Sequence, residues 1–197
     1  MSDGGLRRQD RAMSGADIEA LLQSARVAQF ATVGADGEPY VVPNLFLYAE
    51  GRIHLHTALA GHFRRNVEHR PRLCVAVAEP GEVYPYGAFA CDITTSYASV
   101  VGFGAVAIES DAAAKSAFFD RFLAKYADAR WNQPKSFYPR LDQVTVYRVD
   151  LERVTGKRNQ LLPIAEQWPA RNRTKSPGAV PPTNLSPDTS QAISNRK

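Results

Sequence analysis

The stretch AQFATVGADGEPYVVPNLFLYAEGRIHLHTALAGHFRRNVEHR, residues 28–70, decides the fold of this chain. Asp36-Gly37 is a typical hairpin turn between two strand-like segments. Glu50-Gly51 turns the chain a second time, before the predicted strand 52–57. Pro43 lies inside the middle strand, and proline cannot donate to a ladder, so it indicates an edge, a bulge or a barrel corner. We therefore predict a three-stranded antiparallel meander.

The remainder of the chain adds more strands than helices. Ser14 begins a predicted helix over about 15–25 as its N-cap, and two more helices are predicted over 61–69 and about 111–126. Further strands are predicted at 73–78, 97–109 and 144–151. Six or so strands with few helices favour a mainly β fold, a small antiparallel barrel with flanking helices. We predict an N-terminal arm (1–13), one domain (14–165) and a disordered basic tail (166–197).

Charge and composition exclude several kinds of partner. The chain of 197 residues has a formal charge of +4. Residues 171–197 hold five basic residues and one acid, 5 − 1 = +4, which leaves 19 − 19 = 0 for the rest. The basic pI therefore belongs to the tail, so neither nucleic acid nor a membrane is the predicted partner of the body. The absence of a signal-like start and of a CxxC pair favours a cytoplasmic protein, with Cys74 and Cys91 as buried thiols.

The segment 53–66 reads as a strand that passes through a short turn into a basic helix. Unpaired N–H groups and the helix dipole favour an anion at such a helix start, and small residues in the turn let a ligand approach the backbone. Phe63 and Val67 are expected to pack on the barrel, which leaves His62, Arg65 and Asn66 near the opposite face, with Arg64 on the flank. The alternative is an ordinary helix with a solvated basic face.

His54 and His56 lie on one face of the strand, and Ile53 and Leu55 lie on the other, which we assign to the barrel interior. No further residue has a spacing that demands a third ligand, so we predict no metal site. Two histidines on an outer face imply a polar or interfacial environment. We expect a ligand, a partner chain or both to cover them.

The order of segments resembles a known family. The residues FATVGADGEPYVVPNLFLYAEGRIHLHTALAGHFRRNVEHRPRLCVAV (30–77), YASVVGFGAVAIE (97–109) and FYPRLDQVTVYRVDLERVTGK (137–157) carry the resemblance. They are similar to flavin-nucleotide-binding split-barrel proteins related to pyridoxamine 5'-phosphate oxidase. The nearer match is the Nim-type branch of nitroimidazole-reductase-like proteins. The resemblance covers about residues 7–163.

This resemblance implies a six-stranded antiparallel FMN-binding split barrel that forms a homodimer, with one FMN per site across the interface. It implies that Val42, Pro43 and Asn44 contact the isoalloxazine ring and that Thr57 and Ala58 contact the flavin and its ribityl chain. Gly61 and the first helical turn would hold the phosphate, and Tyr97 and Ser99 would reach the flavin from a neighbouring position. Many relatives carry a lysine where this chain has Phe63, so His62, Arg64 or Arg65 must meet the phosphate charge.

The function expected from the resemblance is an FMN-dependent oxidoreductase that passes electrons from NAD(P)H to a small acceptor. His56 is the candidate catalytic residue, since imidazole can donate a proton near neutral pH; the alternative is a histidine that only fills the dimer interface. Two other functions stay open: a non-catalytic flavin-binding protein, or a split barrel that holds haem or a deazaflavin coenzyme. The carboxy-terminal substrate motif of true pyridoxamine-phosphate oxidases is missing, which argues against that activity.

Overall fold

The computed structural model describes residues 5–85, 90–128, 130–132 and 136–161. The predicted tail, 166–197, lies outside these residues. The chain divides into two compact units. The first contains the residues up to Glu79 together with Ala98–Lys157, and the second contains Pro80–Tyr97 and the residues from Arg158. All of the site described below, except Tyr97, belongs to the first unit.

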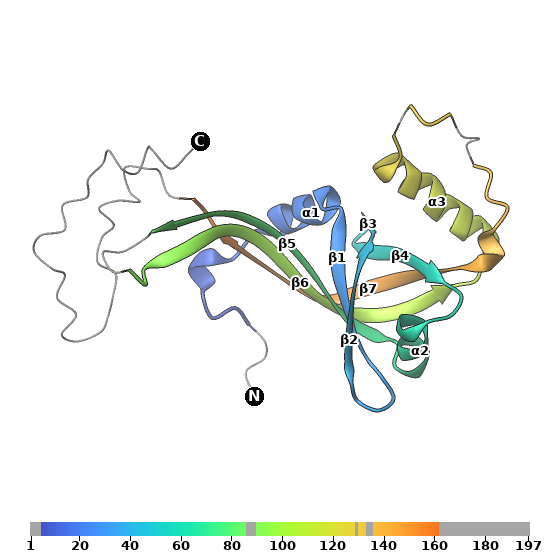
Figure 1. Cartoon of the computed structure of the whole chain (residues 1–197), viewed down its shortest axis with the longest axis horizontal. Coiled ribbons are helices and arrows are strands. Elements are labelled where there is room, and N and C mark those ends of the chain that lie inside the picture. The colour runs from blue at the N-terminus through green and yellow to red at the C-terminus, as the bar shows by residue number, and fades with distance from the viewer. Residues whose placement is uncertain (1–4, 86–89, 129, 133–135, 162–197) are drawn as a thin grey trace, which may run out of the picture. The chain divides into compact units, whose positions relative to one another are not determined.

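In the part of the chain that the structure describes, seven strands form one antiparallel sheet in the order β2-β1-β5-β6-β7-β4-β3 (Figure 1). The mainly β fold with flanking helices is therefore confirmed, but the sheet has seven strands and not six. The strands are β1 (Val27–Val33), β2 (Pro39–Leu45), β3 (Leu47–Ala49), β4 (Arg52–Ala58), β5 (Arg72–Pro85), β6 (Ile93–Glu109) and β7 (Val144–Asn159).

The additional strand arises because the middle strand of the predicted meander breaks at Phe46. Before the break, β2 pairs with β1, and after it β3 pairs with β4. β2 and β3 stand at opposite ends of the strand order, yet a single residue joins them. The sheet must therefore curl until its two edges meet at Phe46, whose side chain is fully buried. Pro43 lies on the edge strand β2, opposite Gln29, as its missing N–H predicted.

Within the described residues, three α-helices flank this sheet: α1 (Gly15–Ser24), α2 (His62–His69) and α3 (Ala112–Tyr126). Ser14 caps α1 as predicted, since its hydroxyl accepts from the N–H of Asp17. Two short 3-10 turns lie at Gln9–Arg11 and Leu141–Gln143. Residue Ala12 of the N-terminal arm forms a β-bridge with Lys157. None of the described helices is long and apolar enough to cross a membrane.

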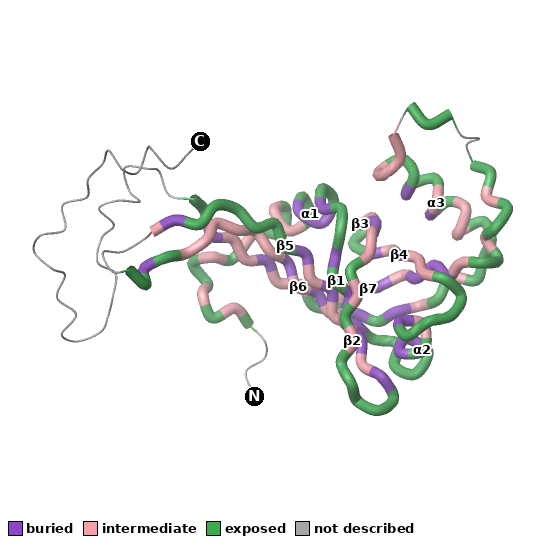
Figure 2. Tube along the Cα trace, viewed as in Figure 1, coloured by how far each residue is buried: buried purple, intermediate pink, exposed green. Residues whose placement is uncertain are grey.

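The main core packs between the sheet and the helices α1 and α2. Ile53 and Leu55 are fully buried there, which confirms the face assigned to the barrel interior. α2 contacts β1 and β2 and contributes Phe63 and Val67 to the same core. Figure 2 shows the buried positions along β1, β4 and β7 and on one side of α2. A second, smaller cluster lies under α3 and contains Phe118 and Phe122.

Candidate functional site

The turn between β4 and α2 has a backbone conformation that glycine alone adopts easily. Gly61 has φ 141° and ψ 175°, and a Cβ placed on it would meet no atom within 4 Å. The helix begins immediately after it, without a side-chain cap and without an acidic residue in its first turn. The first N–H groups of α2 therefore have no side-chain cap and no acidic residue in the same turn, which suits an anion.

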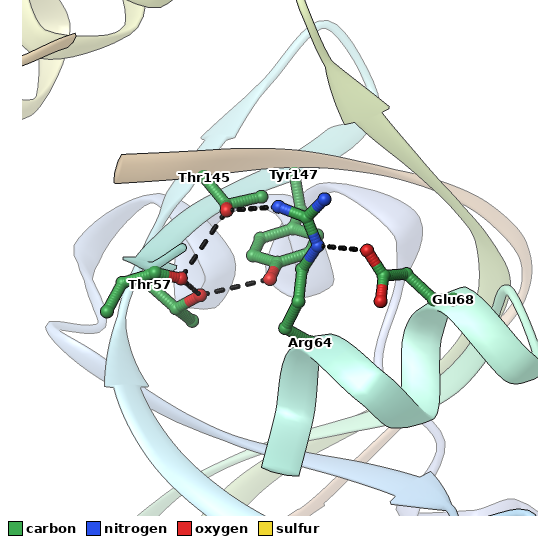
Figure 3. A network of polar contacts seen from close by, with 6 residues as sticks. Thr57, Arg64, Glu68, Thr145 and Tyr147 are labelled. Carbon is green, nitrogen blue, oxygen red and sulfur yellow. Dashed lines mark hydrogen bonds and ion pairs between the residues drawn. The ribbon is translucent and has the colours of Figure 1, made fainter. Parts of the chain in front are cut away.

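Arg64 holds the inner side of this turn through a network of polar side chains (Figure 3). Its Nε donates to Glu68 at 2.6 Å, and its Nη1 donates to the hydroxyl of Thr145 at 2.6 Å. Thr145 is buried at the start of β7, where it pairs with Thr57 of β4. Arg64 thus fixes the end of the β4–β7 ladder, and one carboxylate already balances part of its charge.

Thr57 belongs to the same network but faces the barrel side of β4. Its hydroxyl lies 3.0 Å from the hydroxyl of Tyr147 and donates to the carbonyl of Ala58 at 2.9 Å. Tyr147 is fully buried, and burial raises the pKa of its phenol, so it remains a neutral partner for Thr57. The predicted cofactor residues Thr57, Ala58 and Arg64 are therefore brought together, with Thr145 and Tyr147 behind them.

Phe63, at the position where the resemblance implies a lysine, is a core residue. Its ring packs edge-on against Phe30 and Tyr147, with centroids 6.4 Å and 5.2 Å away. His62 stacks on Tyr40 of β2 at 4.3 Å, while Arg65 is exposed. The expectation that Asn66 lies on the opposite face is wrong. Asn66 is buried, and its side-chain amide donates to the hydroxyl of Thr32 at 3.0 Å. The side of α2 that packs against the sheet therefore includes Asn66 as well as Phe63 and Val67.

Strand β2 brings its predicted residues toward the same region. The side chain of Asn44 donates to the backbone carbonyl of His56 at 2.8 Å, next to Thr57, and so bridges the two edge regions of the sheet. Val42 packs against the core, so only its backbone could face a ligand, whereas Pro43 is exposed on the outer face. Val41, which the sequence did not single out, is also exposed, at 57%.

The outer face of β4 is covered differently from the prediction. The ring of His56 lies 5.8, 5.1 and 5.1 Å from the rings of Phe118, Phe119 and Phe122 of α3. The expectation that a ligand or a partner chain covers His56 is therefore wrong, because a helix of the same chain lies there. Burial lowers the pKa of His56, and its Nδ1 is buried without a hydrogen-bond partner among the described residues. The catalytic role of His56 stays a prediction.

His54 lies on the same face of β4, two residues before His56 and opposite Leu47 of β3. Burial lowers the pKa of His54, and the positive charges of Arg121, Arg148 and Arg52 lower it further. This basic surrounding disfavours a metal ion as well as a proton. Within the described ranges, no group of three His, Cys, Asp or Glu side chains is placed to hold a metal.

Ser99 does not join the site within one chain. Its hydroxyl donates to the carbonyl of Lys157 at 3.4 Å, near the far end of β7. Lys157 is twelve residues from Thr145, which corresponds to roughly 40 Å along a strand at about 3.3 Å per residue. Tyr97 lies in the second unit and is partly buried. The two cysteines also depart from expectation, since Cys74 is only partly buried and Cys91 is exposed.

Thr145 and Tyr147 are the site residues that the sequence did not reveal. They alternate along β7 on the barrel side, so their spacing shows that they share a face. The sequence does not reveal which strand pairs with β7, and only the β4–β7 register places Thr145 and Tyr147 beside Thr57.

Comparisons with known proteins bear on the family and on the fold. The sequence model of the family described as pyridoxamine 5'-phosphate oxidase matches residues 14–158. Among curated proteins, no sequence matches the chain significantly.

Three solved structures share the fold. The flavocytochrome Anf3 from Azotobacter vinelandii is 20% identical, with a TM-score of 0.70 over 93% of this chain and 90% of that one. The FAD and heme binding protein from Mycobacterium smegmatis is 18% identical, with a TM-score of 0.67 over 91% and 94%. A structure described as a putative 5-nitroimidazole antibiotic resistance protein from Bacteroides thetaiotaomicron is 20% identical, with a TM-score of 0.63 over 74% and 85%. At these identities the likeness shows the fold alone.

Proposed function

The chain belongs to the pyridoxamine 5'-phosphate oxidase family, and on this premise we propose that it binds FMN and passes electrons from NAD(P)H to a small acceptor. The observation that carries the proposal is the uncapped start of α2 behind Gly61, with Arg64 beside it. A flavin, when bound, accepts a hydride from a reduced nicotinamide and releases electrons to a second substrate, so the protein's task is to hold and orient it.

The phosphate would lie over the first turn of α2. The N–H groups that follow Gly61 supply donors, and the glycine leaves room for the phosphate oxygens. Arg65 is exposed in this first turn and would add a charge-assisted hydrogen bond. Arg64, already bound to Glu68 and Thr145, supplies a second positive charge from the inner side. His62, stacked on Tyr40, would border the phosphate.

The remaining groups would orient the ring and the ribityl chain. Asn44 already fixes the carbonyl of His56, so the backbone of β2 from Val42 to Asn44 is held beside the end of β4. Thr57 and Ala58 would meet the ribityl chain through their backbone, because the Thr57 hydroxyl is engaged with Tyr147. His56 could act on a substrate only after a movement of α3, since three rings of that helix pack around it.

A homodimer would supply the other side of the site. The outer face of β2, β1 and β5 carries apolar residues: Val41, Pro43, Val27, Ala31, Cys74 and Ala76. Val41 and Val27, which lie on adjacent strands opposite Ala31 and Leu45, are 57% and 44% exposed. Exposed apolar residues gathered on one face are typical of a protein interface. Because Ser99 is distant from Thr57 in one chain, Ser99 and Tyr97 would contact the flavin of the partner subunit.

The proposal is tested on the purified protein. Heat release of the bound cofactor, followed by mass and absorption measurements, should identify FMN, and anaerobic NADH or NADPH should bleach its absorption. Flavin that is bound but not reduced would indicate a binding protein without dedicated catalysis. A haem spectrum or a deazaflavin mass would identify that group as the cofactor in place of FMN. Protein that contains no cofactor and also fails to take up FMN would refute the proposal.

The phosphate placement has its own test. Replacing Arg64 and Arg65 together by Ala should raise the Kd for FMN by about tenfold or more, because charge-assisted hydrogen bonds contribute about 1.5–3 kcal/mol each. Replacing Arg70, which follows α2, and Arg72, the first residue of β5, by Ala removes the same charge and should leave the Kd unchanged. An unchanged Kd in the Arg64, Arg65 variant would move the phosphate elsewhere.

A further inference from the structure

A pocket of about 340 Å³ lies between α3 and the start of β7. Its walls are mainly apolar, and three aromatic side chains line it: Phe119, Phe137 and Tyr138. This volume is within the range of small-molecule sites, which are concave, largely apolar and carry few polar groups. Aromatic walls of this kind suit a planar ring, which they can contact edge-on or in an offset stack.

Arg140 gives the pocket a positive charge. It lines the pocket, and its side chain has no hydrogen bond or ion pair among the described residues. Asp120, which the pocket residue Tyr138 contacts, is already engaged, since it accepts from Ser136 at 2.8 Å and from Tyr138 at 2.6 Å. A guanidinium at an apolar wall favours a planar anion such as a carboxylate, which it can bind through two parallel hydrogen bonds.

The rim of the pocket is fixed to the candidate cofactor site. Lys115 of α3 donates to the carbonyls of Leu141 and Val144, at 2.9 Å each, and so holds the helix to this rim. Val144 lines the pocket and pairs in register with Ala58, and the next residue, Thr145, binds Arg64. Phe119 contacts both the pocket and the ring of His56, whose centroid is 5.1 Å away.

We propose that this pocket binds a planar aromatic carboxylate, with the ring against Phe119 and Phe137 and the carboxylate on Arg140. This binding does not rest on the proposed function.

Calorimetry with 2-naphthoate as the probe tests the proposal, and 2-naphthalenemethanol serves as the uncharged analogue. We expect saturable binding of 2-naphthoate that is about tenfold tighter than binding of the alcohol, as one charge-assisted pair would give. Arg140→Gln should remove this preference, and Phe137→Ala, a change at an exposed residue, should weaken both ligands. Arg121→Gln is the matched control, because Arg121 is an exposed arginine of α3 that faces Glu50.

Three results would overturn the proposal: no saturable binding of 2-naphthoate, equal binding of the two ligands by the wild type, or an Arg140→Gln variant that keeps the preference. The flavin content and the reduction by NADPH are measured on the same samples. Binding of 2-naphthoate without flavin would refute the proposed function alone, and flavin reduction without binding of 2-naphthoate would refute the pocket alone.

Discussion

The hydroxyl of Tyr126 binds both backbone groups of Phe46. It accepts from the N–H of Phe46 at 3.1 Å, and its single proton is shared between the carbonyl of Phe46 at 2.6 Å and that of Arg26 at 2.8 Å. Lys125 donates to the carbonyls of Ala25 and Phe46, at 2.7 and 3.2 Å. The end of α3 therefore satisfies the backbone at the residue where the chain leaves one edge of the sheet for the other.

Tyr126→Phe should consequently destabilise the fold. The backbone groups of Phe46 would lose their partner in a partly buried place, which costs about 1–3 kcal/mol in the free energy of unfolding. Urea denaturation measures this loss. Tyr48→Phe is the matched control, because the Tyr48 hydroxyl has no hydrogen bond among the described residues, and its effect should stay within about 0.5 kcal/mol. Equal effects of the two substitutions would contradict the role of Tyr126.

Gly61→Ala should weaken FMN binding and reduce stability together. The added methyl group has space, but a φ of 141° is unfavourable for any residue with a Cβ, so the turn would strain or rearrange by about 1–3 kcal/mol. Gly15→Ala adds a methyl group in similarly open space at the start of α1 and should be neutral or slightly stabilising. Thermal unfolding and FMN titration of both variants provide the measurement.

The buried His56 should make stability depend on pH. Burial lowers its pKa below the usual 6.5, so between these two values the unfolded chain binds more protons than the folded one. Stability is therefore fully present above pH 6.5 and falls as the pH decreases through that value toward the folded pKa. His56→Phe should reduce this loss, since phenylalanine suits the rings of Phe118, Phe119 and Phe122 and carries no titratable group.

The measurement compares urea denaturation of the wild type and of His56→Phe at pH 7.5 and 5.5. His69→Gln, a change at the exposed last residue of α2, controls for the removal of any histidine. The same loss of stability in the wild type and in His56→Phe would rule out His56 as its source.

The features that the sequence predicted well depend on local chemistry. Gly37 and Gly51 have φ of 85° and 75°, as their hairpin turns require, and Ser14 caps α1 through its own hydroxyl. The helix after Gly61 begins at His62 because only the glycine accepts the preceding backbone conformation. In each case, neighbours within a few residues decide the structure.

The missed features depend on partners distant in the sequence. Phe46 divides a continuous apolar stretch into two strands only because β1 and β4 lie at different places in the sheet. The helical pattern over 112–126 predicted α3, but not that its phenylalanines pack on His56. Asn66 looked like a surface residue until Thr32 supplied a buried hydrogen-bond partner. Periodicity identifies a face, and only the tertiary pairing decides what covers it.

The ladder between β4 and β7 also sets the order in which the chain can fold during synthesis. Residue Arg52 pairs with Asp150, so β4 leaves the ribosome almost a hundred residues before its partner strand. The β1–β2 hairpin can form at once, whereas β4 must wait with only the three-residue β3 beside it. An unpaired strand edge with apolar Ile53 and Leu55 is prone to intermolecular pairing. Nascent chains that stop short of β7 are therefore expected to need chaperone protection that the complete protein does not.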